Sequence, residues 1–170
     1  MKDIYIDRLN EQDAQELFAF ECNNRRFFEH TVQSRGDDYY SFGTFETRHK
    51  ELLKEQEDAI SSFYLIKDSS GIIVGRINLV DIDPINGTAH VGYRIGEAFT
   101  QKGIANEALK LLVNLAPELN VTQIYAKTTS SNMFSQKVLV KNGFERISVN
   151  TENNLDTGQK VTFYHFSKNL

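Results

Sequence analysis

A run of three β-strands in the middle of the chain most limits the folds open to it. From Ser62 the apolar residues follow a two-residue period, first in SSFYLIKD and then in GIIVGRINLVDID, with a turn at Asp68 to Gly71 between them. Asp83 to Gly87 then turns the chain into a third strand. Short turns of this kind join antiparallel neighbours, so the sequence predicts a three-stranded meander.

Helical and strand patterns on either side of this meander complete an α+β fold. Asn10 to Asp13 offer capping residues for a first helix, and Pro117 ends an amphipathic helix that follows Gly103. Asn142-Gly143 closes the last helix in the left-handed conformation. The expected elements are, in chain order, a strand near 4–9, a helix from 14, a charged helix over about 46–59, the three strands, a helix over 104–116, a strand over 121–129, a helix from 132 to 142 and a hairpin of 145–151 with 158–167.

Two segments near the N-terminus carry less regular signals. Asn23 to Phe45 is rich in aromatic residues and has poor periodicity, so we expect an irregular segment that lines a substrate pocket. Cys22 lies in an apolar-periodic stretch, which favours a place in the core over a role as nucleophile. As the one cysteine of the chain, it excludes an intrachain disulfide and a cysteine-rich zinc module.

Length and composition indicate one domain over residues 1–170. With 170 residues and 40% hydrophobic content the chain can build one sizeable core. No run of about 18 apolar residues is present, and the charged N-terminus lacks the apolar centre of a signal peptide, so we expect a cytoplasmic protein without a membrane partner. The net charge of -4 argues against direct nucleic-acid binding, and the isolated histidines without an HExxH pair predict no metal site.

The segment from Thr88 to Asn106, TAHVGYRIGEAFTQKGIAN, carries the strongest functional signal. Its pattern predicts a strand, a short loop and then a helix whose first turn is marked by Gly103. The first backbone N–H groups of a helix have no partner within it, and glycine leaves them open to a ligand. The segment therefore predicts a site where the backbone binds a pyrophosphate.

A second segment, NMFSQKVLVKNGF from Asn132 to Phe144, completes a family pattern. Together with TQKGIA and the NEAL run after it, this segment resembles the acyl-coenzyme A signature of the GNAT N-acetyltransferase superfamily, in detail the RimJ/RimL branch that acetylates ribosomal-protein N-termini. The resemblance implies a GNAT fold, in which a central, mostly antiparallel sheet of about seven strands is splayed at the cofactor site and flanked by about four helices. It also implies acetyl-CoA as cosubstrate and no metal.

The resemblance assigns cofactor contacts residue by residue. Backbone N–H groups around Gly103 would bind the pyrophosphate, and the strand VGYRI would bind the pantetheine arm. The resemblance places positive charge beside the pyrophosphate at Lys102 and beside the 3′-phosphate of the nucleotide at Lys137 and Lys141. A simpler interpretation of all three lysines as surface charges stays open. The implied cofactor-binding residues are Tyr93, Ile95, Gln101, Lys102, Gly103, Ile104, Ala105, Asn106, Asn132 and Ser135.

The usual catalytic side chains of the family are replaced in this chain. His90 occupies the position of a common glutamate, and an imidazole is able to take a proton from an amine directly or through water. Leu139 stands where many relatives carry a tyrosine acid, so the resemblance assigns the role at the sulfur to Ser135. A structural role for His90 or Ser135 stays open, and Glu97 is a further candidate base.

These residues predict an acetyl-CoA-dependent N-acetyltransferase. A primary amine, either a protein N-terminus such as that of a ribosomal protein or a small-molecule amine, would attack the thioester directly in a ternary complex. The replaced catalytic residues leave one alternative, an acyl-CoA-binding or sensing protein that kept the fold and lost the chemistry. The branch also makes a homodimer an expectation.

Overall fold

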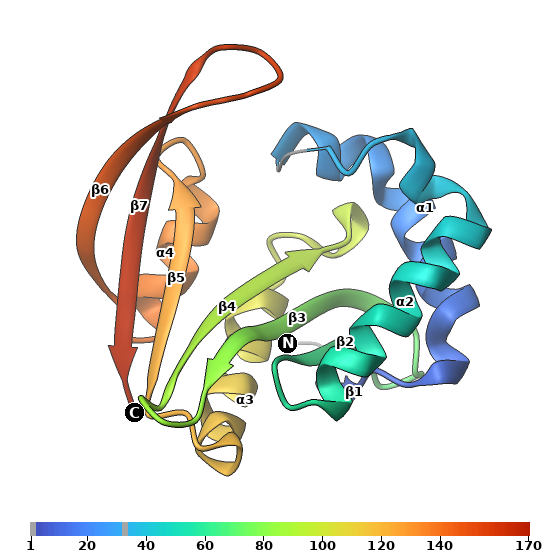
Figure 1. Cartoon of the computed structure of the whole chain (residues 1–170), viewed down its shortest axis with the longest axis horizontal. Helices are drawn as coiled ribbons and strands as arrows, with labels where there is room; N and C mark the ends of the chain where they lie inside the picture. Colours follow the sequence, from blue (N-terminus) through green and yellow to red (C-terminus); the bar gives the residue numbers. More distant parts are fainter. Residues whose placement is uncertain (1–2, 32–33) are drawn as a thin grey trace.

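The fold is built on one seven-stranded sheet, seen in a computed structural model that describes residues 3–31 and 34–170 (Figure 1). All neighbouring strands are antiparallel except β4 and β5, which are parallel. The predicted meander is confirmed as β2, β3 and β4, and the terminal hairpin as β6 and β7. In the order β1-β2-β3-β4-β5-β7-β6, the strands span Ile4–Arg8, Ser62–Asp68, Ile73–Asp83, Thr88–Ile95, Gln123–Thr129, Lys160–Asn169 and Glu145–Asn153.

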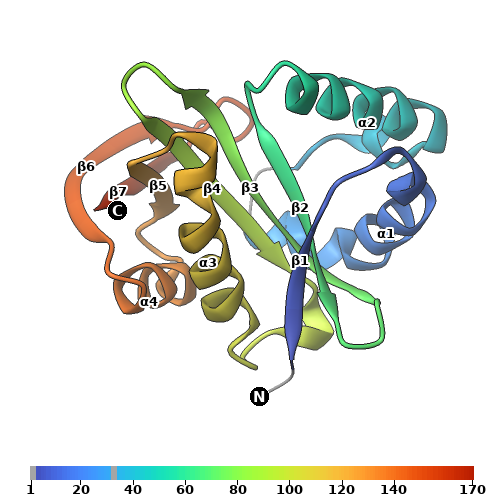
Figure 2. The same ribbon diagram turned by 90° about the horizontal axis from the view of Figure 1, so that it is seen from below.

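Four helices cover the sheet in two layers, which confirms the predicted α+β architecture. The helices α1 and α2 lie on one face, and α3 and α4 lie on the other, as Figure 2 shows. Each layer encloses its own apolar cluster, with Ile77 and Leu109 at the centre of one and Leu17 and Phe45 at the centre of the other. The helices span Ala14–Thr31, Phe42–Glu57, Ile104–Leu115 and Met133–Lys141, with short 3₁₀ turns at Glu11–Asp13, Asp37–Tyr40, Glu97–Phe99 and Ala116–Leu119.

Local sequence signals explain where the helices begin and end. The side chain of Asn10 accepts from the Gln12 N–H while the Asp13 carboxylate accepts from the Asn10 N–H, so the predicted cap before α1 is confirmed. Gly103 precedes α3 with φ of 77°, and Gly143 follows α4 with φ of 80°. Both glycines adopt the left-handed conformation, which the sequence predicts for Gly143 at the end of α4.

Two predictions near the N-terminus are wrong. The segment 23–45 is largely helical, because α1 continues to Thr31 and α2 already begins at Phe42. Its periodicity is hidden because polar residues occupy 23–26, among them the half-buried Asn24, whose side chain has a partner at the distant Glu97. Cys22 is exposed, since it lies one position beyond the inward residue Glu21. Partial desolvation of the thiol still raises its pKa, which does not favour a nucleophilic thiolate.

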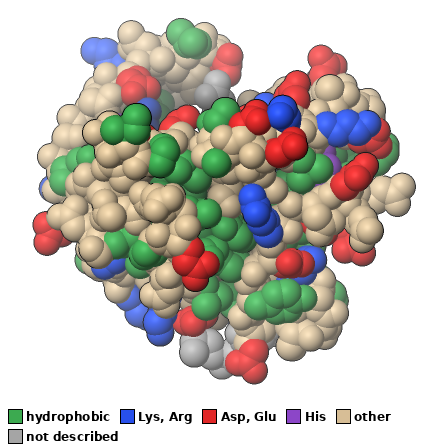
Figure 3. Space-filling view, turned by 60° about the horizontal axis from the view of Figure 1, so that its bottom comes forward, with side chains coloured by type: hydrophobic (Ala, Val, Ile, Leu, Met, Phe, Trp, Pro, Cys, Tyr) green, Lys and Arg blue, Asp and Glu red, His purple; other side chains and the backbone are tan. Residues whose placement is uncertain are grey.

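The surface shows no strong segregation of charge on the face drawn in space-filling form. Figure 3 shows acidic and basic side chains interspersed among hydrophobic ones there. None of the helices formed by residues 3–31 and 34–170 has both the length and the apolar character needed to cross a membrane.

Candidate active site

The sheet opens between β4 and β5, at the place where the family pattern predicts a splay. The parallel pairing of these strands ends at Val91 and Ala126. Beyond this point β4 continues through Gly92 to Ile95 with β3 as its partner, while β5 continues to Thr129 beside β7, so the two strands diverge (Figure 1). The inner edge of β4 therefore presents unpaired backbone groups that can bind an extended ligand.

A loop at the start of α3 presents a second set of free backbone donors. Among the described residues, nothing accepts a hydrogen bond from the backbone N–H groups of residues 101–106. Gln101 and Gly103 both have positive φ, 60° and 77°, which turns neighbouring N–H groups toward one concavity. A Cβ at Gly103 would meet nothing within 4 Å, so the space in front of this loop is open. Such a loop can bind an anion.

The side chains of this loop hold it in place and leave the backbone open. Ile104 and Ala105 are buried in the core beneath it. Asn106 accepts a hydrogen bond of 2.9 Å from the Asn142 amide, which ties the start of α3 to the end of α4. The Lys102 ammonium turns back and donates to the Ala98 carbonyl at 2.6 Å, so it lies beside the loop.

Tyr93 and Ser135 meet across the opening between the strands. The Tyr93 hydroxyl of β4 lies 3.0 Å from Ser135 Oγ of α4 and 3.4 Å from the Ser135 carbonyl oxygen. Asn132 caps α4 by accepting from the Ser135 N–H at 3.0 Å, which fixes the position of that serine. Burial raises the pKa of the Tyr93 hydroxyl to about 12, and the hydrogen bond to Ser135 offsets only part of the rise.

The pairing of Tyr93 with Ser135 was beyond sequence reasoning, although both residues were expected near the cofactor. The two residues lie 42 positions apart and on different elements, and the family pattern assigns them separate contacts. Ile95, two residues further along the same face of β4, is buried in the core, so only its backbone faces the opening.

His90 lies on the opposite face of β4 from Tyr93. Side chains alternate along a strand, so His90 shares its face with Gly92 and Arg94. The imidazole is exposed, and its centroid is 5.4 Å from the Tyr125 ring on β5, just before the strands part. The two predicted catalytic side chains, His90 and Ser135, therefore approach the opening from opposite sides of the sheet.

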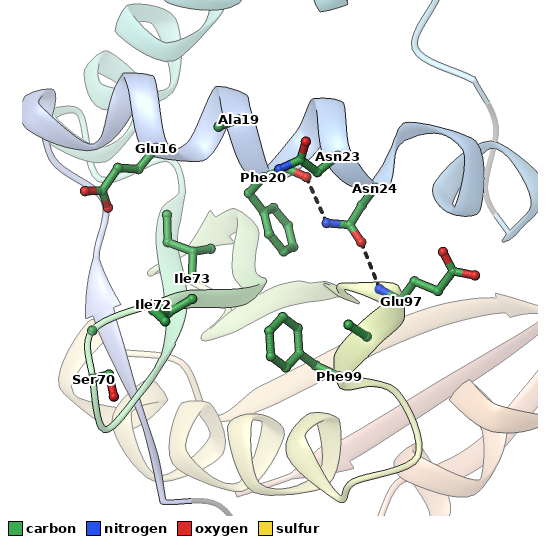
Figure 4. Close-up of a pocket in the computed structure, with 12 residues that line it drawn as sticks. Glu16, Ala19, Phe20, Asn23, Asn24, Ser70, Ile72, Ile73, Glu97 and Phe99 are labelled. Carbon is green, nitrogen blue, oxygen red and sulfur yellow. Dashed lines mark hydrogen bonds between the residues drawn. The ribbon is translucent and has the colours of Figure 1, made fainter.

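Glu97, the other candidate base, lies beyond the end of β4. It belongs to the short turn after β4 and lines a cavity of about 680 Å³ between α1, the β2–β3 turn and Phe99 (Figure 4). Glu97 follows His90 by seven positions that are mostly extended strand, which separates the two residues by about 15–20 Å. The Asn24 side chain accepts from the Glu97 N–H at 2.8 Å and fixes this turn to α1.

On the same face of the sheet as His90, a buried carboxylate joins two arginines. Glu21 of α1 accepts at 2.7 Å from Arg76 of β3 and at 3.0 Å from Arg94 of β4. Burial raises the pKa of Glu21, but the two guanidinium groups outweigh burial and lower the pKa overall. Arg35 donates to the Tyr39 hydroxyl at 3.0 Å, and this hydroxyl also lies 3.4 Å from Arg76 Nη1. We call Glu21, Arg35, Arg76 and Arg94 the arginine cluster.

Comparison with known proteins identifies the family. Residues 3–145 match the family described as acetyltransferase (GNAT) domain. The chain belongs to the GNAT acetyltransferase family. A probable N-acetyltransferase of Bacillus subtilis (strain 168), YjcK, is 34% identical over 160 residues, which cover 89% of this chain and 86% of the relative. This relationship shows that the GNAT chain is an acetyltransferase, and it favours the enzyme over the non-catalytic binding protein.

More distant relatives agree with this assignment. The ribosomal-protein-serine acetyltransferase of Escherichia coli (strain K12) is 26% identical over 141 residues, 79% of the GNAT chain and 74% of the relative. The crystal structure of the ribosomal-protein-S5-alanine acetyltransferase from Vibrio fischeri has a TM-score of 0.90 at 19% identity, with 99% of this chain and 94% of that one covered. The acetyltransferase MccE, solved with acetyl-CoA and AMP, has a TM-score of 0.88 at 20% identity over 99% and 93% of the two chains. The two solved structures confirm the fold.

Metal ligation has no visible counterpart in the described part of this chain. Within residues 3–31 and 34–170, no three His, Cys, Asp or Glu side chains come together as a metal-binding group.

Proposed function

We propose that this GNAT enzyme transfers the acetyl group of acetyl-CoA to a primary amine by direct attack in a ternary complex. One observation carries the proposal: the free backbone N–H groups of residues 101–106 and the unpaired edge of β4 at residues 92–95 lie on consecutive parts of the chain. A long ligand with an anionic end and an amide-containing arm fits such a pair of sites. The sheet includes strands from both ends of the chain, which supports residues 1–170 as one acetyltransferase domain.

In this proposal each part of acetyl-CoA has a place. The diphosphate binds the free N–H groups around Gly103, since backbone donors at a helix start favour anions. The pantetheine amides pair with the inner edge of β4, and Lys137 and Lys141 of α4 approach the 3′-phosphate. The thioester then reaches Tyr93 and Ser135, because their contact spans the opening.

The chemistry follows from the two faces of β4. The neutral amine attacks the thioester carbon, the carbon–sulfur bond breaks, and the amine nitrogen gives its extra proton to His90, directly or through water. The Tyr93 and Ser135 hydroxyls lie 3.0 Å apart, and when Tyr93 is the donor of this pair the Ser135 hydroxyl is free to donate to the departing sulfur. Because Tyr93 has a raised pKa of about 12, it stays protonated and remains a donor throughout the neutral pH range.

The acceptor class is inferred from relatives. The E. coli relative is a ribosomal-protein-serine acetyltransferase and the V. fischeri structure is a ribosomal-protein-S5-alanine acetyltransferase. We infer that this chain acetylates a protein N-terminus or a small-molecule amine of similar shape.

The test is release of free thiol from acetyl-CoA in the presence of peptides beginning with Ser or Ala, polyamines and small primary amines. Turnover that requires an amine, with the acetyl group found on its nitrogen, is the expected result. Tight acetyl-CoA binding without turnover across the panel would instead support a binding protein.

Variants of the two proposed catalytic residues refine this test. His90→Ala is expected to lower kcat and to change the pH–rate profile, while His30→Ala, on the exposed end of α1, leaves both unchanged. Ser135→Ala is expected to lower kcat by about 10- to 100-fold through loss of the donor at the sulfur, with Ser148→Ala on the exposed strand β6 as control. Wild-type rates in both catalytic variants would contradict these roles.

A further inference from the structure

The arginine cluster carries more positive charge than its buried carboxylate can balance. Glu21 has no exposed side-chain surface, and it serves both Arg76 and Arg94, whose side chains are 5% and 14% exposed. One carboxylate for two buried guanidinium groups leaves one positive charge uncompensated, which is costly away from water. Arg35 adds a further positive charge beside Tyr39. The nearby Arg25 already has its own carboxylates, Glu29 and Asp37.

Of the two arginines bonded to Glu21, Arg94 is the one that an incoming ligand can reach more easily. Nη1 of Arg94 is bonded to Glu21, and its guanidinium carbon lies 4.6 Å from the centroid of the Phe28 ring. Nε and Nη2 of Arg94 donate no hydrogen bond to any described residue. Neither atom is among the fully buried side-chain atoms that lack a partner, so both are accessible to solvent. The planar guanidinium is thus held in place by a carboxylate and a ring while two donors stay free.

The free donors lie on the acceptor side of the proposed active site. One face of β4 carries every second residue, here His90, Gly92 and Arg94. The space above Gly92 is open, since a Cβ there would meet nothing within 4 Å. Asn78 pairs with Gly92 across the β3–β4 register, and its side-chain oxygen Oδ1 is buried without a hydrogen-bond partner among the described residues. An amine that enters over Gly92 therefore finds Arg94 about 7 Å further along the strand.

We propose that the acceptor carries an anionic group, a carboxylate or a phosphate, a short distance from its amine, and that Arg94 binds this anion. The inference rests on the proposed acetyl transfer and adds the charge class of the acceptor. Glu21 and Phe28 act as positioning residues, because they hold the guanidinium on the face of β4 that also carries Gly92, while Nε and Nη2 stay free. If Glu21, Arg76 and Arg94 had only a structural role, the charge of the acceptor would not change the rate of acetylation.

The test compares acceptors that differ in charge and little else. The pairs are Ser-Asp and Ser-Asn dipeptide amides, serine and serinamide, and Ser-phosphoserine and Ser-Ser dipeptide amides, with kcat/KM measured by thiol release. We expect at least one anionic member to be preferred by about 10- to 100-fold, the range of a hydrogen bond to a charged group. The first two pairs identify a carboxylate and the third a phosphate.

Variants then tie the preference to one side chain. Arg94→Gln is expected to reduce the preference to about twofold or less, and Arg94→Lys to retain part of it. Arg48→Gln, an exposed change on α2, keeps the wild-type ratio. Acetyl-CoA binding and circular dichroism establish that each variant is folded; if Arg94→Gln does not fold, Arg94→Lys and the wild-type ratios still decide.

Equal rates within every pair, or a preference that survives in Arg94→Gln, would overturn the anion site while leaving acetyl transfer intact. A chain that binds acetyl-CoA and acetylates no amine of either charge would overturn both proposals.

Discussion

Replacement of Gly103 by glutamate tests the proposed phosphate site, and the chain offers a matched control. Gly103 and Gly158 both have positive φ, 77° and 69°, and a Cβ at either position would meet nothing within 4 Å. Gly103→Glu and Gly158→Glu therefore carry a similar backbone cost of about 1–2 kcal/mol. For a chain of this length that cost lowers Tm by roughly 2–8 °C in both variants. Only Gly103 lies at the proposed cofactor loop.

The expected loss of acetyl-CoA affinity follows from electrostatics. A glutamate carboxylate about 7 Å from a diphosphate with two negative charges is repelled by about 1–5 kcal/mol, for effective dielectric constants between 80 and 20. This repulsion corresponds to a roughly 5- to 4000-fold weaker Kd, before any steric effect of the side chain. Part of the effect is screened by salt, so the loss is expected to be larger at low ionic strength.

Isothermal titration calorimetry with acetyl-CoA measures this loss, and thermal unfolding followed by circular dichroism measures the backbone cost. Tryptophan fluorescence cannot report unfolding here because the chain contains no tryptophan, so circular dichroism is the suitable signal. We expect Gly158→Glu to bind like the wild type and Gly103→Glu to bind far more weakly. Equal affinity of the two variants would refute the assignment of residues 101–106 as the phosphate site.

Further predictions concern the two buried polar contacts. Tyr93 has its pKa raised from 10 to about 12 in the folded chain, so its contribution to stability is complete below pH 10 and is lost as the pH rises to 12. Denaturant unfolding is expected to show wild type losing roughly 2–3 kcal/mol more than Tyr93→Phe over this interval; identical pH dependence would count against the buried hydroxyl. Glu21→Gln is expected to destabilise the fold by about 3–5 kcal/mol, because it leaves Arg76 and Arg94 unpaired. The exposed control Glu29→Gln should cost less than about 1 kcal/mol, and similar values for both would argue against the buried cluster.

The local features of the fold were predictable because their signals lie close together in the sequence. The meander follows from two-residue periodicity and turn residues, and α3 follows from Gly103, an apolar stripe and Pro117. The free backbone N–H groups at the start of α3 were predictable for the same reason, since a glycine at a helix start needs no distant partner to expose them.

Features that depend on distant partners were beyond the sequence. The inward face of α1 carries Glu21, and only Arg76 and Arg94, 55 and 73 positions away, make this polar residue compatible with burial. The polar run of residues 23–26 that follows Glu21 interrupts the apolar stripe in the same way, so the length of α1 was missed. The contact of Tyr93 with Ser135 likewise requires the parting of β4 from β5, which no local pattern reports.

A crystal structure of the chain with bound acetyl-CoA tests the central claim most directly. The account predicts diphosphate oxygens within hydrogen-bond distance of the N–H groups of residues 101–106, and the thioester sulfur beside Ser135 Oγ at the parting of β4 from β5. Acetyl-CoA bound elsewhere on the chain, or bound here with its sulfur pointing away from Tyr93 and Ser135, would contradict it.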